Sequence, residues 1–219
     1  MIDIPYNSRI AFFSPHPDDE TFSSGALLYK LGWQNRVKCI FLTSGANGVD
    51  GNYSLDEKIR IREKEARAAC SMFSIWTEFL NWDKNKIKSD LEYKNYLTNI
   101  IDNTDIVFMP HPNEAHPTHK AVNNLIEKIL QNSNIAQCWQ YEVWTPLGKP
   151  NNIYFFGEEE MKIKKKAMKQ YKSQIERTNY IDAIVGLNTY RGIIGKELFG
   201  GFGTYSKDKV YGEAFYVRK

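Results

Sequence analysis

Histidine and acidic side chains gather in two short segments of this chain. The first, residues 15–20, reads PHPDDE, and the second, residues 110–119, reads PHPNEAHPTH. All four histidines of the protein lie in these two segments. Imidazole and carboxylate groups bind divalent metal ions and move protons in hydrolytic enzymes. The two segments are therefore the first candidates for a metal-dependent active site.

Each segment directly follows a short apolar run that is typical of a buried strand. Arg9–Ser14 (RIAFFS) precedes the first segment, and Asp105–Met109 (DIVFM) precedes the second. In an open parallel sheet, ligands bind beyond the carboxyl ends of the strands, where the strand order reverses. We therefore expect two stretches that are about a hundred residues apart to meet at one crevice.

The first two-thirds of the sequence alternate between strand and helix patterns, which predicts an α/β fold with a mostly parallel sheet flanked by helices. Helix starts are marked by capping residues, most clearly by Ser54 and Glu57, which match a capping box. The further expected strands are Arg36–Thr43, Glu78–Trp82 and Gln137–Trp144, and the expected helices are Asp19–Leu31, Ser54–Phe73, Ser89–Asp102 and His116–Gln131.

The last third has a different pattern. Glu158–Arg177 and Tyr180–Ile193 look helical, and Glu213–Arg218 looks like a late strand. No repeat, low-complexity tract or linker separates this part from the rest, and one hydrophobic core can serve 219 residues. We therefore expect a single domain over residues 1–219, with helical and strand additions at its C-terminal end.

Three side chains of the two segments have the types and positions of a metal site. His16 and Asp19 are three residues apart on a turn that enters a helix, and His119 lies on the helix after the second segment. Catalytic zinc takes three ligands from histidine and carboxylate and keeps an open position for water. The set His16, Asp19 and His119 suits zinc, and it also suits other divalent metals such as Fe²⁺.

Two further side chains are then free for proton transfer. Asp18 adjoins the expected metal site, where a carboxylate can take a proton from an attacking water molecule. His116 precedes His119 by three residues and, when protonated, can stabilise an oxyanion or protonate a leaving amine. Either aspartate could instead cap the helix that follows, and a lone His-x-x-His at a helix start is commonly a packing feature. The pair of segments favours the catalytic interpretation.

The bulk properties exclude several other classes. A formal net charge of +3 is too small for a nucleic-acid footprint, and no apolar run approaches the roughly 18 residues of a membrane span. Residues 1–5 lack the basic and apolar regions of a signal peptide. The three cysteines form no CxxC pair, which agrees with free thiols in a reducing compartment. We expect a cytoplasmic protein, with homo-oligomers left open.

The two motifs, HPDDE at residues 16–20 and HPTH at residues 116–119, resemble the signatures of the PIG-L/LmbE-like zinc-dependent N-deacetylases. This resemblance implies a Rossmann-like three-layer fold. It also implies that His16, Asp19 and His119 bind zinc and that Asp18 is the general base with His116 as its electrostatic or acid partner. The implied reaction is hydrolysis of the N-acetyl group of a small-molecule amino-sugar conjugate of GlcNAc type.

The resemblance adds two residues that bind substrate. Arg62 lies on a helix like the family helix whose arginine reaches the substrate, and Asp83 falls where the family often has a sugar-binding aspartate. Arg62 could instead be a surface residue of a charged helix, and Asp83 could be a turn residue. Tyr141 is interpreted as strand packing, and His111, whose role is open, is left out of the metal set. The loop at residues 44–53 is a candidate flap.

Two departures from the family pattern bear on the substrate. Many members carry aspartate where Thr118 stands, and the members that act on GlcNAc-malate carry arginine where Ala115 stands. A malate-bearing substrate is therefore disfavoured. The alternatives that stay open are a zinc amidase acting on a non-sugar amide and a non-catalytic sugar-binding protein.

Overall fold

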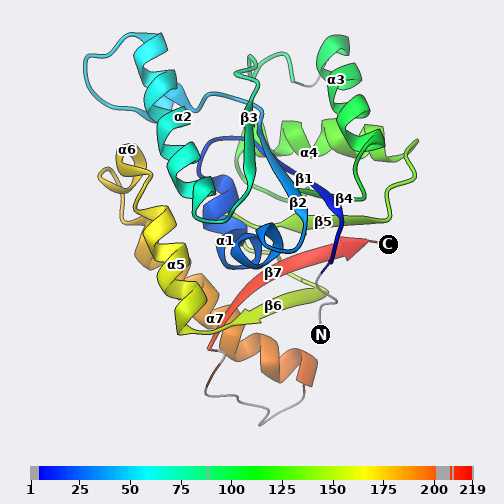
Figure 1. Cartoon of the computed structure of the whole chain (residues 1–219), viewed down its shortest axis with the longest axis vertical. Coiled ribbons are helices and arrows are strands. Elements are labelled where there is room, and N and C mark those ends of the chain that lie inside the picture. Colours follow the sequence, from blue (N-terminus) through cyan, green and yellow to red (C-terminus); the bar gives the residue numbers. More distant parts are fainter. Residues whose placement is uncertain (1–4, 88, 201–207, 209, 219) are drawn as a thin grey trace.

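The computed structural model describes residues 5–218, apart from 88, 201–207 and 209. It shows an α/β molecule in which helices cover a central sheet (Figure 1). The strands are β1 (Arg9–Ser14), β2 (Arg36–Phe41), β3 (Trp76–Phe79), β4 (Ile106–Pro110), β5 (Gln137–Tyr141), β6 (Asn152–Phe156) and β7 (Tyr211–Arg218). The helices are α1 (Asp19–Gly32), α2 (Leu55–Ser71), α3 (Leu91–Asp102), α4 (Pro117–Leu130), α5 (Glu158–Met168), α6 (Lys172–Ile175) and α7 (Tyr180–Gly200), with a short 3₁₀ turn, η1, at Ala46–Gly48.

The seven strands form one mixed sheet in the order β3-β2-β1-β4-β5-β7-β6. The pairs from β3 to β5 are parallel, whereas β7 runs antiparallel to both β5 and β6. The chain moves outward from β1 to β3 and then returns to place β4 on the other side of β1. The expected mostly parallel sheet is therefore confirmed, and the reversal of strand order lies between β1 and β4.

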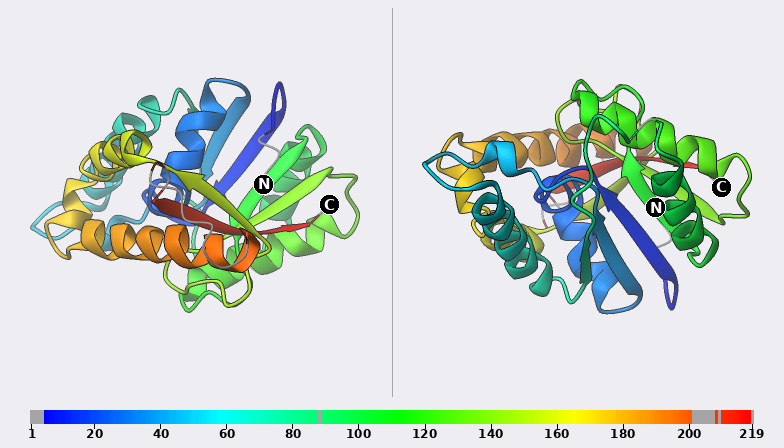
Figure 2. Two further views of the ribbon diagram at one scale, coloured as in Figure 1. Left: turned by 90° about the horizontal axis from the view of Figure 1, so that it is seen from below. Right: turned by 90° about the horizontal axis from the view of Figure 1, so that it is seen from above.

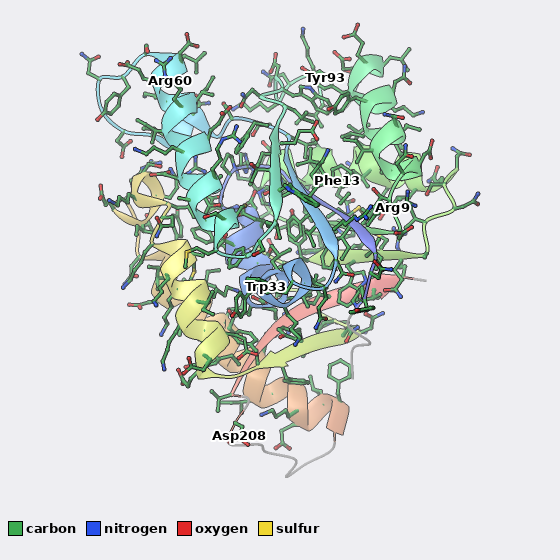
Figure 3. All side chains as sticks on the ribbon, in the orientation of Figure 1. Arg9, Phe13, Trp33, Arg60, Tyr93 and Asp208 are labelled. Atoms are coloured by element: carbon green, nitrogen blue, oxygen red, sulfur yellow. The ribbon has the colours of Figure 1, made fainter. Side chains whose placement is uncertain are left out.

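Side chains that alternate along each inner strand build two separate cores. Ile10 and Phe12 of β1 join the core under α1, α2 and α5, whereas Ala11 and Phe13 join the core under α3 and α4. Figure 2 shows these two helical layers on opposite sides of the sheet. Figure 3 labels Phe13 of β1, which is fully buried, and Arg60 of α2, which is exposed. This three-layer arrangement confirms the expected fold class.

The C-terminal additions differ in detail from the sequence-based expectation. Strand β6 was not predicted, because its run of four apolar residues shows neither helical nor strand periodicity. The helix expected over Glu158–Arg177 ends at Met168 and resumes as α6. The break occurs at Tyr171, which is fully buried and donates a hydrogen bond to Glu20 of α1. A tertiary contact thus overrides local helix propensity. Helix α7 continues to Gly200, beyond the expected end at Ile193.

Within the described part of the chain, no helix is both long enough and apolar enough to cross a bilayer.

Candidate active site

The two chemically active segments meet where the strand order reverses. β1 and β4 are hydrogen-bonded neighbours, with Ile10 opposite Ile106 and Phe12 opposite Phe108. Each segment leaves the carboxyl end of its strand and enters a helix, α1 in one case and α4 in the other. This is the position at which ligands bind in open α/β sheets. The expected convergence of residues 15–20 and 110–119 is therefore present.

Three ligand atoms from these segments face one another at short distances. Asp19 Oδ2 lies 3.2 Å from His16 Nδ1 and 3.1 Å from His119 Nε2, and the two ring nitrogens are 3.3 Å apart. Two ligands about 2.0 Å from a tetrahedral zinc ion are themselves about 3.3 Å apart. Asp19 Oδ1, which is buried, has no hydrogen-bond partner among the residues that the structure describes. The chemistry and spacing of this donor set therefore fit a small divalent cation.

The electrostatics of Asp19 also suit a metal ligand. Burial opposes ionisation of its carboxyl group, but His119 and His16 outweigh burial and hold the pKa of Asp19 well below its usual value. A looser set is formed by His16, His116 and His119, whose ligand atoms all lie within 4.8 Å of one another. We favour the set that contains Asp19, because its three distances already match those of a shared ion.

Asp18 has an unusual backbone conformation. Its φ of 139° and ψ of −29° cost a residue other than glycine about 1–3 kcal/mol. Its N–H donates to Glu20 Oε2 at 3.1 Å, and its carbonyl accepts the N–H groups of Thr21 and Phe22 at 3.1 and 3.0 Å. Backbone strain of this kind concentrates at functional sites. The turn lets Asp18 line the pocket while Asp19, the next residue, is almost completely buried.

Arg62 from α2 supports Asp18. Its Nη2 lies 3.0 Å from Asp18 Oδ2 and also donates to the Pro17 carbonyl. Burial raises the pKa of Asp18 to about 6, even though Arg62 favours the ionised form. A carboxylate with this pKa is ionised at neutral pH and accepts a proton more readily than an ordinary aspartate. Because Arg62 is only 1% exposed, its interpretation as a surface residue is wrong.

His116 is the N-cap residue of α4. Its Nδ1 accepts the N–H of Thr118 at 3.3 Å, which assigns the ring proton to Nε2 in the neutral form. Burial, followed by the imidazoles of His16 and His119, lowers the pKa of His116 to about 4. A neutral ring of this tautomer can donate a hydrogen bond from Nε2 without carrying a charge.

A cavity of about 420 Å³ lies over these groups. It is lined by five of the seven residues singled out from the sequence, namely His16, Asp18, Arg62, Asp83 and His116. The other two, Asp19 and His119, are buried beneath it. Trp82 and Trp144 contribute aromatic surface to its wall. The predicted residues are thus brought together at one hollow.

Asp83 and the 44–53 loop form part of the rim. Asp83 Oδ1 accepts the N–H of Asn85 at 2.9 Å, so it shapes a turn as well as lining the cavity. The loop contains η1, and its Gly48 carbonyl accepts hydrogen bonds from Gln174 at 2.9 Å and Arg177 at 2.8 Å. The candidate flap is therefore fastened to α6 and the residues after it.

The sequence motifs did not single out Glu114, which lies next to the expected metal site. It is fully buried, and its Oε2 is 3.7 Å from Nδ1 of His119. Metal-binding histidines commonly donate the N–H of their second ring nitrogen to a carboxylate. An acidic residue inside the segment HPNEAHPTH was therefore the sequence signal that could have pointed to Glu114.

His111, a neighbour of Glu114, lies 2.8 Å from the Thr145 carbonyl through Nε2 and accepts the Asn113 N–H at Nδ1. His111 thus contacts loop backbone, and Tyr141 donates to the Phe13 carbonyl within the core.

Three solved structures have a closely similar fold. The N,N'-diacetylchitobiose deacetylase from Pyrococcus horikoshii is 22% identical, with a TM-score of 0.78 over 96% of this chain and 84% of its own. The 4-carboxy-2-hydroxymuconate hydratase from Pseudomonas putida KT2440 is 14% identical, with a TM-score of 0.79 over 96% of each chain. Teicoplanin deacetylase in its zinc-inhibited form is 16% identical, with a TM-score of 0.70 over 96% of this chain and 98% of its own. Because a hydratase stands among them, these likenesses show the fold and do not decide the reaction.

The sequence itself matches a family model more directly. Residues 11–130 match the PIG-L model, which describes GlcNAc-PI de-N-acetylases. The matched region includes both histidine segments, as well as Arg62 and Asp83. Because the match spans more than half of the 219 residues, this chain belongs to the PIG-L family.

Proposed function

We propose that this protein, acting as one domain over residues 1–219 in the cytoplasm, is a zinc-dependent hydrolase. In this proposal it removes the N-acetyl group from an amino-sugar conjugate of GlcNAc type, which releases acetate and the free amine. The observation that carries the proposal is the convergence of His16, Asp19 and His119 beside Asp18 at the base of a cavity. Membership of the PIG-L family supports the same reaction, as do the deacetylases among the similar structures.

His16, Asp19 and His119 would hold the metal. We expect zinc, with Fe²⁺ as the alternative, because two histidines and one carboxylate suit both ions. When bound there, the metal would act as a Lewis acid that polarises the acetyl carbonyl.

Asp18 and His116 would carry out the proton chemistry. The Asp18 carboxylate takes one proton from the attacking water, and it can return that proton to the amine nitrogen as the C–N bond breaks. The Nε2–H of His116 donates a hydrogen bond to the oxygen on which negative charge develops. Arg62, whose Nη2 lies 3.0 Å from the Asp18 carboxylate, orients that group. In this assignment His116 acts as a neutral donor, rather than the cation expected from the sequence.

The shape of the cavity suits a sugar with a second group attached. Trp82 and Trp144 offer apolar faces to a sugar ring, and Asp83 offers a hydrogen-bond acceptor to its hydroxyl groups. A second hollow of about 450 Å³ shares Lys84, His116 and Thr118 with the first. The group attached to the amino sugar could extend into it across Thr118.

Acetate release tests the proposal. Zinc-loaded protein is incubated with N-acetylglucosamine linked to inositol, nucleotide, lipid or malate, and acetate is measured with and without a chelator. We expect release from at least one conjugate, its loss after chelation, and little activity on the malate conjugate. Activity on N-acetylated amino acids but on no amino sugar would replace this function with the non-sugar amidase. A protein that binds the conjugates and releases no acetate would be a sugar-binding protein.

A further inference from the structure

Glu114 is a buried acid whose two carboxylate oxygens have different surroundings. Oε1 accepts the backbone N–H groups of three consecutive residues, Val143 at 2.8 Å, Trp144 at 3.1 Å and Thr145 at 3.3 Å. The side chain is fully buried. Oε1 thus fastens the loop after β5, which brings Trp144 to the cavity wall.

Within the described part of the chain, Oε2 of the same carboxylate has no hydrogen-bond partner. It lies 3.7 Å from Nδ1 of His119, which is also buried and for which the described residues likewise offer no hydrogen-bond partner. A buried polar atom without a hydrogen bond costs about 1–3 kcal/mol. The two atoms face each other as an acceptor and a donor. A small decrease in the distance between them would complete a hydrogen bond.

The other nitrogen of His119 faces the expected metal site, because Nε2 is 3.1 Å from Asp19 Oδ2 and 3.3 Å from His16 Nδ1. A histidine binds a metal only through a nitrogen that carries no proton, and the bond made by its second nitrogen decides where the proton resides. We propose that Glu114 is a positioning residue that holds the proton of His119 on Nδ1 and so presents the lone pair of Nε2 to the metal.

This inference rests on the metal site proposed above and adds a residue that the sequence motifs do not assign. It also connects two parts of the site through one side chain. Oε1 sets the position of the Trp144 loop, while Oε2 sets the tautomer of His119. Substitution of Glu114 by glutamine separates these two roles.

The test is the variant Glu114→Gln. Its amide oxygen can still accept the three backbone N–H groups, so the fold should survive. Its amide NH₂ would face Nδ1 of His119, and two N–H donors cannot form a hydrogen bond with each other. We expect the His119 proton to move to Nε2, and the affinity for zinc to fall about 10–100-fold. Zinc affinity is measured by competition with a chromogenic chelator, and circular dichroism checks the fold.

The matched control is Glu127→Gln, which makes the same change on α4, the helix that carries His119. Glu127 pairs with Arg218 at 2.8 Å, and we expect its variant to bind zinc as the wild type does. The His119 tautomer is also read directly in the metal-free wild type by ¹⁵N NMR of the imidazole ring. We expect a protonated Nδ1. This measurement remains decisive if the Glu114 variant does not fold.

The outcomes separate this inference from the proposed function. Wild-type protein that binds no zinc would contradict the metal site, and the role of Glu114 would fall with it. Wild-type protein that binds zinc, together with an equally tight Glu114→Gln variant, would overturn only the role of Glu114. A His119 ring whose Nδ1 carries no proton in the metal-free wild type, with its single proton on Nε2, would overturn that role as well.

Discussion

Asp18 combines a strained backbone, a buried ion pair and a place on the cavity wall, which is why we assign it the role of general base. Asp18→Asn keeps the size of the side chain and removes its ability to take up a proton. General-base catalysis is worth about 10²–10⁴-fold, so we expect kcat for acetate release to fall by that factor. Zinc content, measured by atomic absorption, should stay at the wild-type level.

The control for this variant is Asp102→Asn, which makes the same change in the last turn of α3. It should leave kcat unchanged. An Asp18→Asn protein that turns over at nearly the wild-type rate would show that another group takes the proton.

Arg62 illustrates a different effect at the residue scale, because its buried charge lies against two acids, Asp18 at 3.0 Å and Glu65 at 3.8 Å. Its side chain is 2% exposed, and that of Asp18 is 8% exposed. Removal of one partner of a buried pair leaves an uncompensated charge and costs about 3–5 kcal/mol. We expect Arg62→Leu to lower the free energy of unfolding by that amount in urea titrations. Arg62→Lys, which retains the charge, should lose less. A loss below about 1 kcal/mol for Arg62→Leu would mean that Asp18 is not ionised in the folded protein.

The residue types and their spacing, together with the family resemblance, predicted which side chains meet at the site. His16, Asp19 and His119 each follow from a local strand-to-helix pattern, whereas their meeting requires β1 to pair with β4. The burial of Arg62 could not be predicted in this way, because it depends on how α2 packs over the turn at Pro17. The contact of Glu114 with His119 likewise depends on a loop path that has no periodic signal.

At the scale of elements, the C-terminal additions support the helix that begins at the site. Helix α1 starts at Asp19 and is interrupted at Ser24, whose φ is −130°. Glu213 of β7 accepts the N–H groups of Ala26 and Leu27 at 2.9 and 2.8 Å, beyond this interruption. Its charge is balanced by Lys164 of α5 at 2.6 Å. A strand and a helix from the last third thus fasten α1 behind the two aspartates.

This arrangement predicts non-additive effects on stability. Glu213→Gln and Lys164→Met should each lower the free energy of unfolding by about 3–5 kcal/mol, because each leaves a buried charge without a partner. The double variant Lys164→Met/Glu213→Gln removes both charges and should lose clearly less than the sum of the two single losses. The measurement is a double-mutant cycle from urea unfolding curves. Losses that simply add would mean that the two groups do not interact in the folded protein.

The sequence predicted best those helices and strands that are marked by a local pattern, such as a capping box or an apolar run. The helix after Ser54 begins with the expected capping box, in which Ser54 Oγ accepts the Glu57 N–H and Glu57 accepts the Ser54 N–H. β1 matches the expected range Arg9–Ser14. The break between α5 and α6 and the pairing of β6 with β7 are tertiary events, since both depend on partners far away in the sequence. They therefore could not be read from local patterns.

At the scale of the whole molecule, the expected metal would join two parts of the chain. His16 and Asp19 follow β1, whereas His119 comes from α4, about a hundred residues later. The three groups are already within 3.3 Å of one another. A ligand that binds the folded chain and not the unfolded chain stabilises the fold by mass action. Metal binding should therefore be visible as a change in global stability, independently of any catalytic assay.

Zinc at a free concentration of 100 times its Kd should add about 2.7 kcal/mol to the free energy of unfolding. For a chain of this size that gain raises Tm by about 5–10 °C, measured by differential scanning calorimetry of metal-free and zinc-loaded protein. His119→Ala removes one of the three proposed zinc ligands and should abolish most of the zinc-induced rise in Tm. His111→Ala, which removes a histidine outside the proposed ligand set, should leave the shift intact even though it lowers the metal-free Tm. An equal shift in His119→Ala would mean that zinc binds elsewhere on the molecule.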